Sequence, residues 1–334
     1  MEFIDILIAT YNGEKYIKEL LNSILNQTYK NIRLLICDDC SSDNTYKILE
    51  ECRDKDTRIK LFKNDQNLGS NKTFEYLLTK VTNKYFMFAD QDDVWNLDKV
   101  EVSLNRLLQE KSDLVFTDLE VVDSELNLIN NSFNKLKGYE YKIKKYINDG
   151  YSLEILQNNV TGCTILAKAE WIEKVLPFTE NKNILYDYWI ALIIGLNGKL
   201  SYVDKATIKY RQHDYNQVGA KKYTDKLKNF DEVREHLIRI RIENFNTFIE
   251  NSSIFTPDQN LKNKMAYEYF CNVRDKRIIN FKKINVFNEL YHTSKFFCRF
   301  GMFLILNVPI IARVGYSIRK KFKNKGMWKS IYGK

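Results

Sequence analysis

Three carboxylates, Asp90, Asp92 and Asp93, crowd into four consecutive residues. They directly follow the apolar run 85–89, which is short, aromatic-rich and uncharged and therefore predicts a buried strand. Carboxylates this close repel one another unless a cation lies among them, and hard oxygen ligands suit Mg²⁺ or Mn²⁺. An isolated acidic cluster is a solvated turn as often as a cation site. The surrounding elements must decide between these two interpretations.

The residues around this motif alternate between short apolar runs and segments of helical spacing. Apolar residues recur three and four positions apart between 16 and 25, which predicts a helix with one apolar face. A strand, a crossover helix and a second strand form a unit with parallel pairing. We therefore expect an α/β fold in which a mostly parallel sheet is flanked by helices. The strands are expected at residues 3–9, 32–37, 59–62, 85–89, 114–117, 161–166, 200–203 and 207–210.

Polar side chains follow several of these strands where each strand ends. In open parallel sheets, ligands bind outside the carboxyl ends of the strands. We therefore expect three polar segments, residues 10–12, 38–39 and 90–93, to converge on one crevice. From the residues alone, Asn12 is also a plausible cap of the following helix, and Ser42 and Asp43 a cap of the next.

Five short motifs, in this order, resemble glycosyltransferase family 2. The motifs are residues 6–12, 27–28, 38–45, 67–69 and 90–93, and they carry the resemblance over residues 1–125. The resemblance implies a GT-A fold and a nucleotide-sugar donor. Two later segments, 186–189 and 210–213, resemble the rhamnosyltransferase-like branch of the family.

The resemblance also implies which residues bind the donor. The first loop would line the nucleotide pocket, Asp39 would contact the base or ribose with Asp38 beside it, and residues 67–69 would bring backbone near the donor. An ordinary turn is the equally good alternative for 67–69. The residues implied to bind the nucleotide sugar are Thr10, Tyr11, Asn12, Glu14, Asp38, Asp39, Asn67, Gly69, Asp90 and Arg211.

A divalent cation, Mn²⁺ or Mg²⁺, is the implied cofactor. By resemblance Asp92 is the direct ligand, while Asp90 contacts ribose or metal-bound water and Asp93 holds a ligand in place. His213 would ligate the metal or contact the diphosphate, and the planar fork of Arg211 suits a phosphate. A merely polar strand end is the alternative for both of these residues.

Asp187 is the one acid in an otherwise apolar helical segment, residues 186–197. Burial beside aromatic side chains should raise its pKa and make it a better base. Helix capping is the leading interpretation from the residues alone. The resemblance instead favours a general base that takes the acceptor hydroxyl's proton, with inversion at the anomeric carbon. The family usually shows an acidic pair here, whereas this chain has Tyr186 before Asp187.

The net charge of +9 is concentrated at the C-terminal end, where ten Lys or Arg and no Asp or Glu lie between residues 290 and 334. We expect a catalytic domain over 1–223 and a helical extension over 224–334. The uncharged stretch 300–312 is too short to span a membrane, and the basic cluster 319–325 follows it. This pattern favours in-plane attachment to an anionic inner membrane surface over packing on the protein itself. A basic tail on a nearly neutral body is not typical of a nucleic-acid binder.

The sequence thus favours an inverting, metal-dependent glycosyltransferase. It would move a sugar, plausibly rhamnose from a dTDP or UDP donor, to a surface polysaccharide or lipid-linked saccharide. Acids at residues 2 and 5 occupy the place of a basic signal-peptide region, so we expect a cytoplasmic protein peripheral to the membrane. The alternatives are a nucleotidyltransferase, which should carry a Gly-rich, Arg-containing loop where residues 9–13 lie, and a non-enzymatic membrane- or RNA-binding module.

Overall fold

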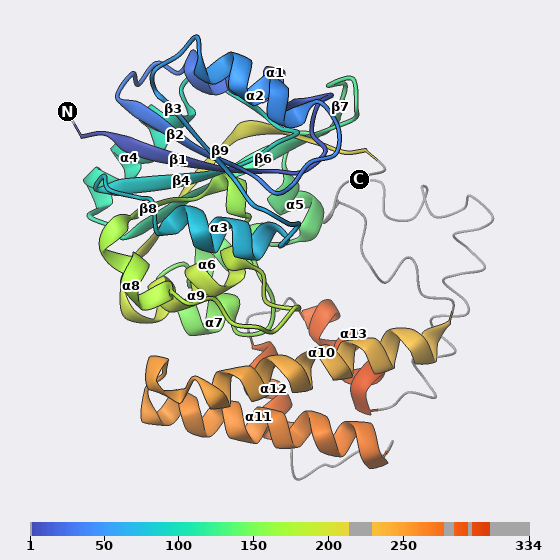
Figure 1. Cartoon of the computed structure of the whole chain (residues 1–334). Helices are drawn as coiled ribbons and strands as arrows, with labels where there is room; N and C mark the ends of the chain where they lie inside the picture. Colours follow the sequence, from blue (N-terminus) through green and yellow to red (C-terminus); the bar gives the residue numbers. More distant parts are fainter. Residues whose placement is uncertain (1, 214–228, 277–283, 293–295, 308–334) are drawn as a thin grey trace. The chain divides into compact units, whose positions relative to one another are not determined.

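The computed structural model describes residues 2–213, 229–276, 284–292 and 296–307 (Figure 1). The chain divides into two compact units, Met1–Ala220 and Lys221–Lys334, which are described separately. The expected boundary at 223–224 and the basic cluster 319–325 lie outside the described residues.

The first unit is built on one mixed, curled sheet. Its strand order is β3-β2-β1-β4-β8-β6-β9-β5, and β7 pairs with β6. The long pairings β1–β2, β1–β4, β2–β3 and β6–β9 are parallel, whereas the antiparallel pairings involve only two or three residues each. The expected α/β class with a mostly parallel sheet is confirmed. The strands are β1 (Ile4–Thr10), β2 (Ile32–Asp38), β3 (Ile59–Lys63), β4 (Tyr85–Asp90), β5 (Val94–Trp95), β6 (Leu114–Val122), β7 (Leu128–Asn130), β8 (Leu166–Lys168) and β9 (Leu200–Arg211).

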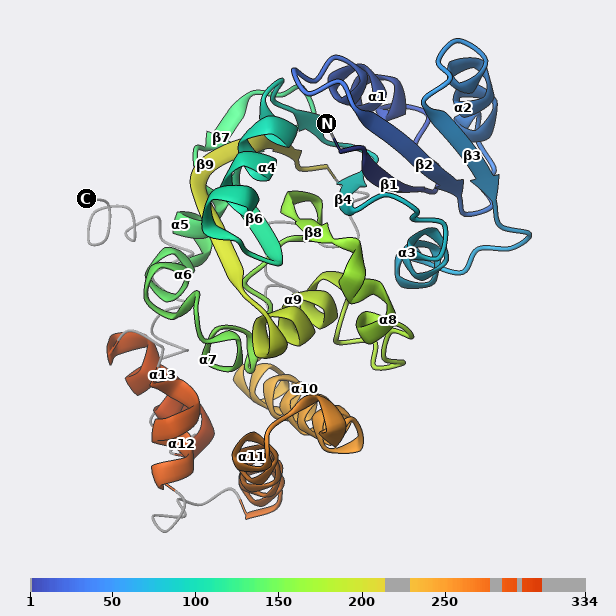
Figure 2. The same ribbon diagram turned by 90° about the vertical axis from the view of Figure 1, so that its left-hand side faces the viewer.

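Helices cover both faces of this sheet. Figure 1 shows α1 and α2 on one side and α3 and α9 on the other, and Figure 2 shows the same layers from the side. The helices of this unit are α1 (Ile17–Leu25), α2 (Thr45–Arg53), α3 (Ser70–Leu78), α4 (Lys99–Glu110), α5 (Phe133–Lys137), α6 (Glu140–Tyr146), α7 (Gly150–Glu154), α8 (Ile172–Val175) and α9 (Tyr186–Asn197).

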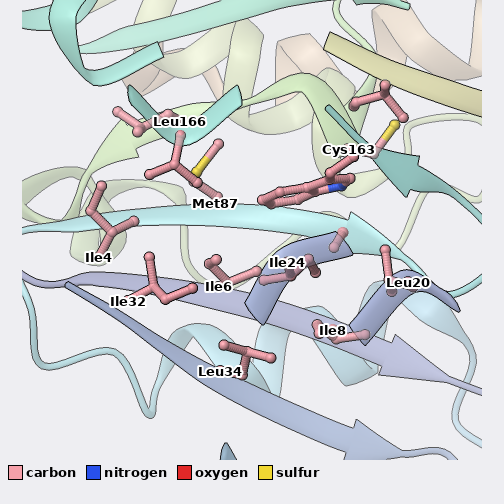
Figure 3. Close-up of a cluster of buried hydrophobic side chains, with 14 of the residues drawn as sticks. Ile4, Ile6, Ile8, Leu20, Ile24, Ile32, Leu34, Met87, Cys163 and Leu166 are labelled. Carbon is pink, nitrogen blue, oxygen red and sulfur yellow. The ribbon is translucent and has the colours of Figure 1, made fainter. Parts of the chain in front are cut away.

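Strand side chains alternate between two apolar layers, as the pleat of a strand requires. On β4, Met87 belongs to the core cluster that β1 forms with α1, where Ile6 and Ile24 are fully buried (Figure 3). The next residue, Phe88, points to the other face and packs against Phe74 of α3 and Tyr186 of α9. A sheet buried on both faces explains why its strands read as continuous apolar runs rather than as alternating ones.

Three local expectations were wrong. Asn12 does not cap α1, whose N-cap is Tyr16; its φ of 48° instead places it in the left-handed region that Asn tolerates. Residues 162–164 form a 3₁₀ turn, so only the short β8 follows where a strand was expected over 161–166. The two strands expected at 200–203 and 207–210 are one strand, β9, because register shifts against β6 absorb the polar residues between them.

The described part of the second unit is helical, with α10 (Phe230–Glu250), α11 (Pro257–Lys276), α12 (Ile284–Tyr291) and α13 (Phe296–Asn307). The buried Arg234 of α10 donates to the carbonyls of Val273, Ile305 and Leu306, which lie near the C-terminal ends of α11 and α13. A cation is favourable at such ends. None of the helices that the structure describes is long and apolar enough to cross a membrane.

Candidate active site

The parallel register brings the predicted site residues to one edge of the sheet. Thr10 of β1 pairs with Asp38 of β2, and Ala9 pairs with Asp90 of β4. Asp38 and Asp90 therefore flank the end of β1, each one strand spacing of about 4.8 Å away. The three polar segments expected to converge do so at the carboxyl ends of adjacent strands.

The β1–α1 loop is tied to the β2–α2 loop by hydrogen bonds from both sides. The Asn12 amide donates to Ser41 Oγ, and the Asn12 carboxamide oxygen accepts from the Ser42 amide, each at 2.9 Å. One Glu14 carboxylate oxygen accepts the Asn44 backbone and side-chain amides at 2.9 and 2.8 Å. The side chains of Asn12 and Glu14 thus hold two loops together, while the Tyr11 side chain is exposed.

Asp38 and Asp39 are both buried and both accept several hydrogen bonds. Asp38 accepts from the Thr10 hydroxyl at 3.1 Å and from the hydroxyl and amide of Ser41 at 2.6 and 3.0 Å. Asp39 accepts from the backbone amides of Leu68 and Gly69, each at 2.8 Å. The segment 67–69 is therefore more than an ordinary turn, since Asp39 holds its backbone beside the ends of β1 and β2.

The acids after β4 lie in a poorly solvated place. Burial, together with the charges of Asp92 and Asp187, raises the pKa of Asp90 to about 7. Burial and the neighbouring acids also raise the pKa of Asp93 well above its ordinary value. Ligand atoms of Asp90, Asp93 and Cys163 lie within 4.8 Å of one another. Burial raises the pKa of the Cys163 thiol well above its ordinary value, and thiolates suit softer metals than Mg²⁺ or Mn²⁺.

Asp92 and His213 form the second part of this acidic site. His213 Nε2 lies 2.8 Å from Asp92 Oδ2, and the imidazole stacks on Tyr16 with ring centroids 5.0 Å apart. The carboxylates of Asp90 and Asp92 are oxygen ligands of the kind that Mn²⁺ and Mg²⁺ prefer, whereas an imidazole such as that of His213 is more typical of softer transition metals. Among the described residues the Asp93 Oδ2 atom is buried without a geometric hydrogen-bond partner, and a bound cation would satisfy it.

The guanidinium of Arg211 is buried and bonds to protein groups around the acidic loop. Arg211 is 3% exposed, and its guanidinium donates to the backbone oxygens of Asp92 (2.8 Å, from Nε) and Ser124 and to the carboxylate of Glu19. The guanidinium also stacks on Tyr16, 4.4 Å from the ring centroid. This geometry makes Arg211 a support of the acidic loop. Its expected contact with a donor phosphate remains a prediction.

Asp187 lies in the first turn of α9 and is 8% exposed. Its two oxygens accept from the backbone amides of Tyr188 at 2.7 Å and Gly162 at 3.0 Å. Burial raises its pKa to about 6, and its charge in turn raises the pKa of Asp90. Helix α9 thus begins near the acidic site. Asp187 accepts a hydrogen bond from a backbone amide of its first turn, and its charge acts on Asp90.

Several residues that the sequence did not single out also belong to the site. Gln91 lies within the acidic motif and bonds the backbone of Tyr11. Glu154 is fully buried near Asp187, and burial raises its pKa to about 8. Lys99 is fully buried with its Nζ over the Trp95 ring, and burial lowers its pKa to about 7. Gln91 was within reach of sequence reasoning because it stands between two assigned acids, whereas the other two carry no local signal.

Comparison with known proteins shows the family to which the chain belongs. Residues 5–184 match the family model described as glycosyl transferase family 2, so the chain belongs to that family. It is 30% identical to the dTDP-rhamnosyl transferase RfbG of Shigella flexneri over 80% of this chain and 90% of that protein. It is 27% identical, over 68% and 84%, to the Escherichia coli glucosyltransferase WfgD. The chain spans only 48% to 66% of the length of other curated relatives.

Solved structures share the fold at low sequence identity. S. aureus TarS, residues 1–349 in complex with UDP-GlcNAc, has a TM-score of 0.53 and 18% identity over 88% of this chain and 82% of that one. The mannosyltransferase PcManGT of Pyrobaculum calidifontis, in complex with GDP-Man and Mn²⁺, has a TM-score of 0.54 and 13% identity over 100% and 88%. These likenesses confirm the GT-A-type fold expected from the sequence.

Proposed function

We propose that the protein is an inverting glycosyltransferase that moves a sugar from a nucleotide-sugar donor to a saccharide acceptor. The observation that carries the proposal is that the charge of Asp187, at the start of α9, acts on Asp90, which pairs with Ala9 at the end of β1. Membership of family 2 supports transfer over nucleotidyl transfer or a non-enzymatic role.

The donor's nucleotide would lie across the three strand-end loops. Tyr11 offers an exposed ring to a base, and Asp39 holds the backbone amides of Leu68 and Gly69. Asp38 and Thr10 fix the floor of this pocket through their buried hydrogen bond. The first loop is thus held by hydrogen bonds before any nucleotide binds, which would lower the entropy cost of binding.

A divalent cation is part of the proposal. Asp92, Asp90 and His213 would hold it, and when bound it would stabilise the negative charge that builds on the leaving diphosphate. Arg211 keeps these ligands in place by holding the Asp92 carbonyl at 2.8 Å, so the loop is preorganised.

Asp187 would act as the general base. Its carboxylate takes the proton of the acceptor hydroxyl while the hydroxyl oxygen attacks the anomeric carbon. The bond from that carbon to the diphosphate breaks and its electron pair leaves with the nucleoside diphosphate. The amides of Gly162 and Tyr188 hold the carboxylate in one orientation without using all of its lone pairs.

The relatives guide the finer assignment. One is by name a dTDP-rhamnosyl transferase, and another transfers glucose from UDP-Glc to GlcNAc-diphosphoundecaprenol. We therefore assign dTDP-rhamnose as the first donor to try and a lipid-linked saccharide as the acceptor class. Attachment of the basic C-terminal residues to an anionic membrane surface would place the site near such an acceptor.

Isothermal titration of the full chain with UDP and dTDP, each with and without Mn²⁺, tests this function. We expect binding of at least one of them that needs the metal, weakened about tenfold or more in Asp92→Ala. Asp54→Ala is the matched control, since Asp54 is an exposed acid at the end of α2. Lack of metal-dependent binding to either nucleotide would contradict the proposal. Hydrolysis of a panel of nucleotide sugars then identifies the donor.

A further inference from the structure

Gln91, between two acids of the site, makes a reciprocal pair of hydrogen bonds with one backbone unit of the first loop. Its Nε2 donates to the Tyr11 carbonyl at 2.9 Å, and its Oε1 accepts the Tyr11 amide at 2.9 Å. A carboxamide side chain donates and accepts in one plane in this way at any pH, whereas a carboxyl group does so only when it is protonated. A glutamate would place an oxygen against the Tyr11 carbonyl, and a shorter or apolar side chain would not reach.

The pairing continues the sheet beyond the ends of its strands. The β1–β4 register ends at Ala9 and Asp90, after which the two chains diverge into separate loops. The Gln91 side chain spans the gap that opens and bonds the backbone of Tyr11, as a neighbouring strand would. The bridge therefore fixes the first loop relative to the acids on either side of Gln91.

The absence of a side chain at Gly13 leaves the space that the Gln91 carboxamide occupies. A Cβ added at Gly13 would lie 2.4 Å from Gln91 Oε1 and 2.7 Å from Gln91 Cδ, so any other residue would displace the carboxamide. The Gly13 amide meanwhile donates to Thr45 Oγ1 at 2.7 Å, a contact that does not involve Gln91. The first loop thus has two separate attachments, one to the β2–α2 loop and one to the acidic loop.

We infer that Gln91 is a positioning residue that sets the distance between the nucleotide-binding loop and the metal-binding acids. This inference rests on the proposed function, because a donor with its base at one loop and its diphosphate at the other spans both. Loss of the bridge should leave the first loop attached to the β2–α2 loop but no longer aligned with the acids. The donor then binds more weakly although the fold is intact.

Four variants test the inference: Gln91→Ala, Gln91→Glu, Gly13→Ala and the double variant Gly13→Ala with Gln91→Ala. Each removes the same bridge, so we expect the affinity for UDP or dTDP with Mn²⁺ to fall about tenfold in the single variants. Gln91→Glu should have the lowest nucleotide affinity of the single variants, since it adds a negative charge beside three acids. The double variant should bind no worse than the weaker alanine variant, because the clash at Gly13 needs the Gln91 side chain.

Amide hydrogen exchange provides a readout that does not depend on ligand. In Gln91→Ala the Tyr11 amide should exchange faster, whereas the Asn12 and Gly13 amides, bonded to Ser41 and Thr45, should keep their protection. The melting temperature should change by only about 2–4 °C, since the two hydrogen bonds that are lost are exposed to solvent.

The outcomes separate the two claims. Unchanged Tyr11 exchange in Gln91→Ala, or additive losses in the double variant, overturns the bridge. Faster exchange with unchanged nucleotide affinity shows a bridge that does not position the donor and overturns the inference while the proposed function stands. If the wild-type chain binds neither nucleotide, the proposed function fails, and the donor role of Gln91 fails with it.

Discussion

Asp187, the general base that we propose, is held in one orientation and has a pKa above the ordinary value of an aspartate. Backbone amides of Gly162 and Tyr188 orient the carboxylate, and burial raises its pKa to about 6. Tyr186, the residue before it, packs against Phe74 and Phe88. The position where the family usually has an acid therefore belongs to the apolar core in this chain.

Asp187→Asn should lower kcat about 10²–10⁴-fold, because the amide cannot take a proton. The nucleotide affinity should stay within about twofold, since binding uses the strand-end loops. Steady-state kinetics and titration with UDP and Mn²⁺ measure the two effects. Transfer at a near wild-type rate would place the base elsewhere.

The pH dependence follows from the same residue. Only ionised Asp187 accepts a proton, so with saturating metal kcat should fall about tenfold per pH unit below about 6, and Asp187→Asn should lack this limb. The sign for stability is opposite. The folded-state pKa lies above the ordinary value of 3.8, so ionisation lowers the free energy of unfolding as the pH rises from 3.8 through about 6. This pH dependence of the free energy of unfolding should be absent in Asp187→Asn, because an amide does not titrate.

At the scale of elements, close packing of α7 against α9 positions the helix that carries Asp187. Gly150 begins α7, and a Cβ added there would lie 2.2 Å from the carbonyl carbon of Gly195 in α9. Backbone cannot give way as a side chain can, so the two helices must separate. At Gly195 the added Cβ would meet Gly150 Cα and the flexible end of Leu200, each at 3.0 Å, which is a milder clash.

Gly150→Ala should therefore destabilise the chain by about 1–3 kcal/mol through overpacking. It should also lower kcat, because α9 moves with Asp187 at its first turn. Gly195→Ala should cost less than half as much. Urea denaturation followed by circular dichroism ranks the two variants, and equal stabilities would refute close helix contact at Gly150.

At the scale of the whole molecule, the described end of the C-terminal segment belongs to the packed helical unit. Within α13, Leu306 and Asn307 are buried, Asn307 bonds the Tyr269 hydroxyl, and Arg234 binds the carbonyls of Ile305 and Leu306. Residues 305–307 thus pack on the helices of their own unit, as the alternative to a membrane-bound tail would have it. Membrane attachment, as proposed, is left to the basic cluster 319–325.

Replacing the five basic residues of that cluster by Gln should abolish cosedimentation with vesicles that contain phosphatidylserine. Each basic residue contributes about 1 kcal/mol near an anionic surface, so partitioning should fall by nearly four orders of magnitude at low salt. Nucleotide binding should not change. The matched control removes five exposed lysines of the first unit, Lys18, Lys30, Lys47, Lys55 and Lys60. Equal losses in both variants would show only a net-charge effect.

How much was predictable depends on the range of the interaction involved. The apolar runs of β1, β2 and β4 and the helix over 186–197 were readable because periodicity and burial act within one element. The cap assigned to Asn12 failed because that side chain binds Ser42, which is 30 residues away. The sequence predicted two strands in place of β9 because the middle of β9 is polar. Pairing with the neighbouring strand β6 keeps that middle part extended.

The sequence by itself determined the family, the α/β class and the set of acids, because each depends on residue types in a local order. The tertiary structure decided what those residues do to one another. It placed Arg211 behind the Asp92 carbonyl, set Asp187 beside Asp90, and joined Gln91 to Tyr11 across 80 residues. These relations depend on which strands are neighbours and in what register, and pairing between distant segments leaves no periodic trace in a single chain.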